Sequence, residues 1–129
     1  MRGLIAFFAL VAVPANGQEI VVPSGQPVTF FEVLHDIPGP VGTAHRYRFV
    51  APRIAREGGD IDAATAAADI DALCESFVLP QIDLSDEVPD QVIISLADRP
   101  VRFGEPAPEA TQFFESYRIE DGACVWEEF

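Results

Sequence analysis

Hydrophobic and polar residues alternate over much of the first third of the chain, which is typical of β-strands. The alternation is clearest at residues 44–50, and residues 28–34 are rich in β-branched and aromatic side chains. A shorter apolar run at residues 20–22 precedes a turn-forming cluster at residues 23–26. These patterns predict three strands. One face of the third strand, expected to face the core, would carry His45, Tyr47 and Phe49. Its other face, turned toward solvent or a partner, would carry Arg46, Arg48 and Val50.

The middle of the chain has the pattern of an amphipathic helix. Asp60 or Asp62 could cap its N-terminus after the Gly-Gly pair at residues 58–59, and Pro80 would end it. Alanine-rich residues between these limits favour helix. The apolar face expected at helical spacing consists of Ile70, Leu73, Cys74 and Phe77.

The last part of the chain predicts strands again. Residues 92–96 are apolar apart from one serine, which indicates a central strand buried on both faces, and residues 101–103 could form a short strand. Residues 111–119 and 123–129 flank Asp121-Gly122, a strong signal for a two-residue hairpin turn. A tight turn would pair Ile119 with Cys124 and Tyr117 with Trp126. One face of this hairpin would then carry Phe113, Tyr117, Ile119, Cys124 and Trp126.

Two cysteines, Cys74 and Cys124, predict one disulfide if the chain is exported. The alternatives are two free buried thiols or a dimer through one cysteine. The disulfide would join the helix to the terminal hairpin. Together with the strand pattern, it predicts an α+β fold with a mostly antiparallel sheet, one main helix packed on it and the order β-β-β-α-β-β-β.

The N-terminus has the features of a secretory signal peptide. Arg2 precedes an unbroken apolar run at residues 4–13, Pro14 follows, and small residues stand before Gln18. We therefore expect residues 1–17 to be a signal peptide, residues 18–129 to be a single α+β domain, and the protein to be periplasmic or secreted. An uncleaved anchor is the alternative, although the run is short for a membrane span.

The chain is strongly acidic, with 21 Asp and Glu residues against 8 Lys and Arg, a net charge of −13. Cleavage after residue 17 would remove Arg2 and make the net charge one unit more negative. Such a surface repels nucleic acid and anionic membranes, so neither is expected as a partner. The acidic surface is consistent with a soluble secreted protein whose charge has no specific role. It is also consistent with a protein that binds a basic partner. The chain contains no lysine, which excludes reactions that need a lysine amine.

Several stretches of the chain resemble a family of small, exported, uncharacterised alphaproteobacterial proteins. The resemblance rests on residues 22–28, 47–52, 73–75, 94–96, 103–105, 108–110, 112–114 and 124–127, the C-terminal stretches being the most specific. It covers nearly all of the expected mature chain and implies no activity. Proteins of this kind sometimes carry an acetolactate synthase label. The sequence does not support that label, because a thiamine-diphosphate enzyme needs several hundred residues and a diphosphate-metal motif.

No cofactor and no metal site is predicted. His35 and His45 are the only histidines, and no third or fourth ligand follows from their spacing. The acidic pairs at residues 60–62, 69–71 and 83–87 lack the loop pattern of a calcium site.

No catalytic residue is predicted either. The chain has no Gly-x-Ser-x-Gly elbow, and Ser95 lies within the predicted central strand. Four carboxylates on predicted strands could form an acid/base pair, but their spacing selects no two of them. They are Glu32, Glu115, Glu127 and Glu128.

One uneven feature is a cluster of arginines within residues 46–56. It consists of Arg46, Arg48, Arg53 and Arg56. Guanidinium groups recognise carboxylates and phosphates, so this cluster is the candidate site for a small anionic ligand or an acidic protein partner. The alternative is that the arginines pair with acidic strands of the same chain. The pattern therefore favours a binding or assembly module over an enzyme, with a small secreted hydrolase or lyase using strand carboxylates and a histidine as the alternative.

Overall fold

The computed structural model describes residues 20–84 and 88–128, so the expected signal peptide and Phe129 lie outside the described residues. Five strands form one sheet in the order β1-β2-β3-β4-β5. They are β1 (Thr29–Gly39), β2 (Gly42–Val50), β3 (Gln91–Ala97), β4 (Gln112–Glu120) and β5 (Ala123–Glu127). All neighbouring strands are antiparallel except β2 and β3, which are parallel. The α+β fold with a mostly antiparallel sheet is therefore confirmed.

The main helix, α1 (Ala63–Leu73), connects the two parallel strands, as a parallel pair requires. Asp62 caps it, because its Oδ1 accepts a hydrogen bond from the Thr65 N–H at 2.9 Å. The chain then continues through a π-helical turn, η2 (Cys74–Val78), and a 3-10 turn, η3 (Leu79–Gln81). Pro80 was expected to end the helix, but it lies inside η3, and the helical segment continues to Gln81. Proline is tolerated there because the first turn of a helix needs no N–H from it.

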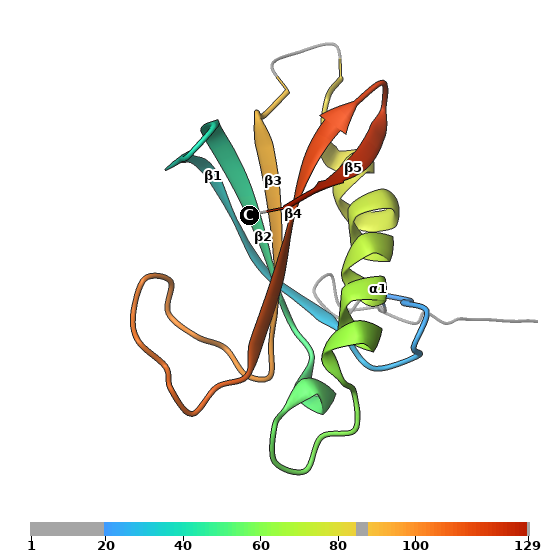
Figure 1. Cartoon of the computed structure of the whole chain (residues 1–129), viewed down its shortest axis with the longest axis vertical. Coiled ribbons are helices and arrows are strands. Elements are labelled where there is room, and N and C mark those ends of the chain that lie inside the picture. The colour runs from blue at the N-terminus through green and yellow to red at the C-terminus, as the bar shows by residue number, and fades with distance from the viewer. Residues whose placement is uncertain (1–19, 85–87, 129) are drawn as a thin grey trace, which may run out of the picture.

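The core lies between α1 and one face of the sheet, as Figure 1 shows. Tyr47 and Phe49 point into it from β2, as the alternation predicts, and Ile70 and Leu73 meet them from the helix. Every residue of β3 is buried, which confirms it as the central strand.

The disulfide is confirmed and joins the helical segment to the terminal hairpin. Cys74 and Cys124 are bonded, with their Cα atoms 6.3 Å apart. The hairpin register pairs Ile119 with Cys124 and Tyr117 with Trp126, as expected. Asp121 and Gly122 both adopt positive φ, 53° and 74°, which is what a type I′ turn requires.

One strand of the expected order is absent from the described part of the chain, so the strand and helix order is β-β-α-β-β-β, and the possible short strand at residues 101–103 is absent as well. Residues 20–22 are not a strand, because the segment turns at Gly25, whose N–H donates to the Val22 carbonyl, and its polar side chains bind α1 instead of a sheet edge. Residues 101–103 belong to the long connection between β3 and β4. That connection projects from the side of the sheet away from α1 (Figure 1).

Candidate binding face

The side of the sheet away from α1 carries two of the four clustered arginines. Strand alternation places Arg46 and Arg48 on this face of β2, opposite the buried Tyr47 and Phe49. The connection between β3 and β4, residues 98–111, folds against the same face, since the Val101 carbonyl accepts a hydrogen bond from Arg48 Nη2 at 2.6 Å. The connection therefore covers the Arg48 side chain, which strand alternation alone would leave facing solvent.

Arg48 is an internal group, contrary to the expectation that it faces solvent. It retains only 6% of its exposure, and its Nη1 pairs with Glu32 on the neighbouring strand. Its guanidinium also lies 5.3 Å from the centroid of the Phe31 ring and 5.5 Å from that of Phe103. Arg48 therefore ties β1, β2 and the 98–111 connection together, and its charge is already compensated.

Arg46 differs from Arg48 because it forms no ion pair with any residue that the structure describes. Its guanidinium stacks on two phenylalanine rings, at 5.3 Å from the centroid of Phe103 and 5.7 Å from that of Phe114. Partial burial and then the nearby positive charge of Arg48 lower the pKa of Arg46. The result is a half-buried cation whose guanidinium donates no hydrogen bond to any residue within 20–84 and 88–128.

The surroundings of Arg46 are aromatic and exposed. Phe31, Phe103 and Phe114 retain 41%, 43% and 49% of their exposure. We call these three residues and Arg46 the Arg–Phe face. Aromatic residues and arginine are the side chains enriched at binding surfaces, and exposed apolar clusters on soluble proteins commonly mark such surfaces.

The base of the 98–111 connection is held by Asp98. Its backbone N–H donates to the Thr111 carbonyl at 3.0 Å, and its Oδ1 accepts from the Thr111 N–H at 3.1 Å. The Arg99 side chain pairs with the same carboxylate at 2.9 Å. Hydrogen bonding from Arg99 is the main reason that the pKa of Asp98 is lowered, opposed by burial and assisted by the Thr111 N–H.

Asp98 should therefore make stability depend on acid pH. Because its pKa is lower in the folded chain, its stabilisation is fully present above the unfolded pKa of about 4 and is lost as the pH falls through the folded value. Urea unfolding of the wild-type protein and of Asp98→Asn should show a difference in stability at pH 7 that shrinks below about pH 4. A difference that stays constant down to pH 2 would contradict this assignment.

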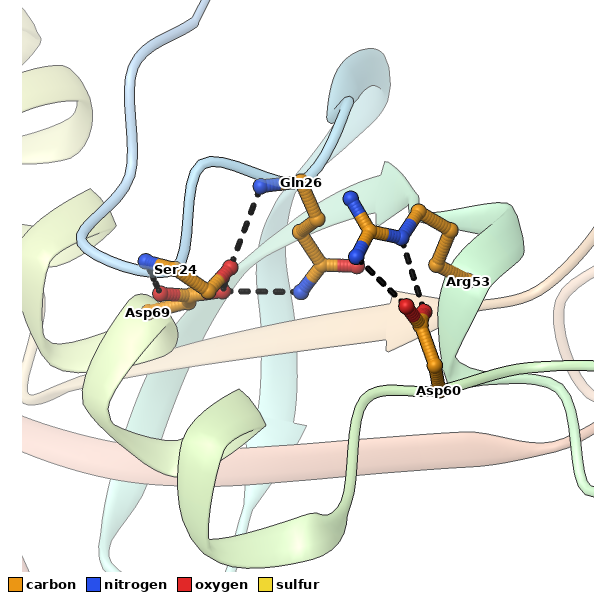
Figure 2. A network of polar contacts seen from close by, with 5 residues as sticks. All are labelled: Ser24, Gln26, Arg53, Asp60 and Asp69. Carbon is orange, nitrogen blue, oxygen red and sulfur yellow. Dashed lines mark hydrogen bonds and ion pairs between the residues drawn. The ribbon is translucent and has the colours of Figure 1, made fainter.

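Arg53 and Arg56 lie away from the Arg–Phe face, beyond the end of β2. Arg53 forms a two-bond pair with Asp60, its Nε and Nη2 donating to Oδ1 and Oδ2 at 2.8 and 2.7 Å, as Figure 2 shows. Arg56 donates from Nη2 to the Pro108 carbonyl at 2.8 Å. Arg46 and Arg48 thus lie together on one face of the sheet. Arg53 and Arg56 lie elsewhere and bind loop residues, Asp60 and Pro108 respectively.

A buried polar network on α1 was not anticipated from the sequence. Asp69 is fully buried, and its carboxyl accepts hydrogen bonds from the Ser24 N–H, the Ser24 hydroxyl and Gln26 Nε2 at 2.9, 2.5 and 2.8 Å (Figure 2). The sequence has carboxylates on both sides of Ile70, Asp69 and Asp71, and no local pattern marks Asp69 as the buried one. The network fastens the segment before β1 to the helix.

The two histidines meet at the far end of β1 and β2. Their rings are in edge-to-face contact with centroids 4.7 Å apart, and His45 Nε2 lies 3.5 Å from Asp36 Oδ1. His45 and Asp36 line a hollow with Thr43, Val88, Pro89 and Asp90. Asp90 is engaged there, because its Oδ2 accepts a hydrogen bond from the Thr43 N–H at 2.9 Å. Within residues 20–84 and 88–128, no three His, Cys, Asp or Glu side chains are grouped closely enough to hold a metal ion.

The strand carboxylates considered for acid/base chemistry are dispersed. Glu32 pairs with Arg48, Glu115 accepts a hydrogen bond from Trp126 Nε1 at 2.6 Å, and Glu127 pairs with Arg118 at 2.8 Å. Ser95 is buried in β3. The structure brings none of these carboxylates into the hollow beside His45.

Comparison with known proteins identifies a family without an assigned role. The chain belongs to DUF6497, a family of unknown function, whose profile matches residues 6–129. No curated protein and no solved structure matches the chain. In the described residues there is no helix with the length and apolar character needed to cross a membrane.

Proposed function

We propose that this member of the DUF6497 family is an exported binding module that captures an anionic ligand or the anionic group of a partner at Arg46. The observation that carries the proposal is the state of its guanidinium. It is half-buried between Phe103 and Phe114 and has no carboxylate partner among the described residues, in a chain with an excess of acidic side chains. An external anion would supply the missing partner.

The other three clustered arginines take different parts in this proposal. Arg48 positions the site, because its contacts with Glu32 and Val101 hold the 98–111 connection against the sheet. Arg53 and Arg56 are engaged by Asp60 and the Pro108 carbonyl, so we do not include them in the binding site. The ligand would meet the Arg46 guanidinium, which has no carboxylate partner in the described part of the chain, and the rings of Phe103 and Phe114.

Replacing Arg46 with glutamine should weaken binding of small anions at least tenfold, because a hydrogen bond to a charged group contributes roughly 1.5–3 kcal/mol. Heteronuclear NMR titration with phenylacetate, acetate, phosphate and sulfate measures this at residue level. The matched control is Arg53→Gln, since Arg53 belongs to the same arginine cluster but is paired with Asp60 away from the Arg–Phe face. Binding that survives Arg46→Gln, or that is lost in Arg53→Gln, would contradict the proposal.

Export is the second part of the proposal, and it is supported by the sequence pattern of residues 1–17 together with the disulfide. The exported protein should begin at Gln18, as glutamine or as its cyclised form pyroglutamate, with residues 18–129 as one domain. Intact mass of the protein recovered from its native compartment checks this expectation. Recovery of a soluble form that retains residues 1–17 would contradict it.

A small hydrolase or lyase is the second candidate, and the hollow that contains His45 and Asp36 is the observation that favours it. An imidazole next to a carboxylate is the usual arrangement of a general base. The NMR titration separates the two candidates. Shifts centred on His45 and Asp36 favour an enzyme, whereas shifts centred on Arg46 and Phe103 favour the binding module.

A further inference from the structure

The Arg–Phe face continues into an apolar groove between β1 and the 98–111 connection. The groove has a volume of about 480 Å³, within the range of small-molecule sites. Its apolar lining consists of Phe31, Leu34, Pro100, Val101 and Phe103. Glu32 and Arg102 complete the lining, and each has an internal partner, Arg48 and Glu105 respectively.

Arg46 stands at the side of this groove. It is the cross-strand neighbour of Leu34, and residues so paired place their side chains next to each other on the same face of a sheet. Its guanidinium also stacks on Phe103, which lines the groove. A ligand bound to Arg46 would therefore reach the groove directly with any apolar part.

The charges select the kind of anion. One guanidinium offers two parallel N–H donors, which match the two oxygens of a carboxylate. A phosphate dianion would bring a second negative charge close to Glu32 and into a protein of net charge −13. A single carboxylate satisfies Arg46 and adds the least repulsion.

We infer that the Arg–Phe face and this groove bind a small amphipathic monocarboxylate, with the carboxylate on Arg46 and the apolar chain along Leu34 and Phe103. The inference rests on the proposed function and specifies its ligand class. The two parts of the ligand have separate residues, so they can be tested separately.

The probes are decanoate, hexanoate and acetate, with decanol as the uncharged control, titrated calorimetrically into the purified protein with its disulfide intact. Each methylene removed from the chain should weaken binding about two- to fourfold, depending on how completely the groove covers it. Decanol should bind at least tenfold more weakly than decanoate, because it cannot form the charged pair with Arg46.

Variants assign the two ends of the ligand. Arg46→Gln should weaken decanoate binding roughly ten- to hundredfold, and Arg46→Lys, which keeps the charge, should lose less. Leu34→Ala should weaken decanoate several-fold and leave acetate unchanged. Arg53→Gln is the matched control, because Arg53 is paired with Asp60 away from the groove, and it should bind decanoate as the wild-type protein does. The thermal midpoint of each variant shows that it is folded, and Leu34→Ala and Arg46→Lys keep the test decisive if Arg46→Gln does not fold.

The failures are distinguishable. If decanoate binds no more tightly than acetate while Arg46 is still required, the amphipathic ligand is wrong and anion capture at Arg46 stands. If decanol binds as tightly as decanoate, or if no carboxylate binds, the inference is wrong. If decanoate binds equally well to Arg46→Gln, both the inference and the proposed function are wrong.

Discussion

Replacing Cys74 or Cys124 with serine should lower the free energy of unfolding by about 2–5 kcal/mol. The bond closes a loop with a sequence separation of 50 residues, and constraining a loop of this length in the unfolded chain contributes roughly 4 kcal/mol in the chain-entropy model. That is a large share of the roughly 5–15 kcal/mol available to a small domain. Urea unfolding of each variant measures the loss.

The two cysteine variants should not be equal. Cys74 is fully buried beneath the sheet, whereas Cys124 is only half-buried, so a serine at residue 74 would also place a hydroxyl in the core. We expect Cys74→Ser to be the less stable of the two. The control is the wild-type protein unfolded in the presence of a reductant, which should match Cys124→Ser. Unfolding midpoints that do not respond to reduction would contradict the stabilising role of the bond.

Asp69→Ala should cost about 3–5 kcal/mol, the second large effect. The substitution leaves the Ser24 N–H and Gln26 Nε2 without their acceptor in a buried position, and it opens a space against α1. Residues 20–28 should then detach and expose Val22 and Val28, which are otherwise buried. Hydrogen exchange at these residues, together with urea unfolding, measures both consequences.

Asp69→Asn keeps one carbonyl acceptor and should lose less than Asp69→Ala. Asp60→Ala is the matched control, because Asp60 is another aspartate near the same helix and accepts two hydrogen bonds from Arg53, but its side chain is 63% exposed. An exposed pair contributes little, so its unfolding midpoint should stay close to that of the wild-type protein. Equal effects of Asp69→Ala and Asp60→Ala would show that the buried network contributes no special stability.

Local patterns were sufficient to predict much of the fold. The alternation at residues 44–50 predicts the two faces of β2, and Asp121-Gly122 predicts both the hairpin and its register. Asp62 as a cap follows from its place before an alanine-rich helix. These features depend on interactions between residues that are near in sequence, where backbone geometry and side-chain type leave few choices.

Long-range features were less accessible. The apolar run at residues 20–22 resembles a strand, but Ser24 and Gln26 bind Asp69, 45 and 43 residues later in the chain. The helical segment continues past the point expected from Pro80, because proline fits the first turn of η3. In the first case the local prediction failed because of hydrogen bonds to a residue distant in sequence. In the second it failed because the chain adopts a less common helical geometry that accepts proline.

The sequence by itself determined the helix-on-sheet class, the cysteine pair, the acidic charge and the presence of four arginines within eleven residues. Only the tertiary structure separated those arginines by their partners. Glu32 and the Val101 carbonyl satisfy Arg48, Asp60 satisfies Arg53, and Arg46 is left between Phe103 and Phe114. Alternation along a strand determines the face on which a side chain lies. The residues that contact Arg46 and Arg48 on that face depend on how residues 98–111 fold back across the sheet. Contacts between residues so far apart in sequence are not encoded in any local pattern.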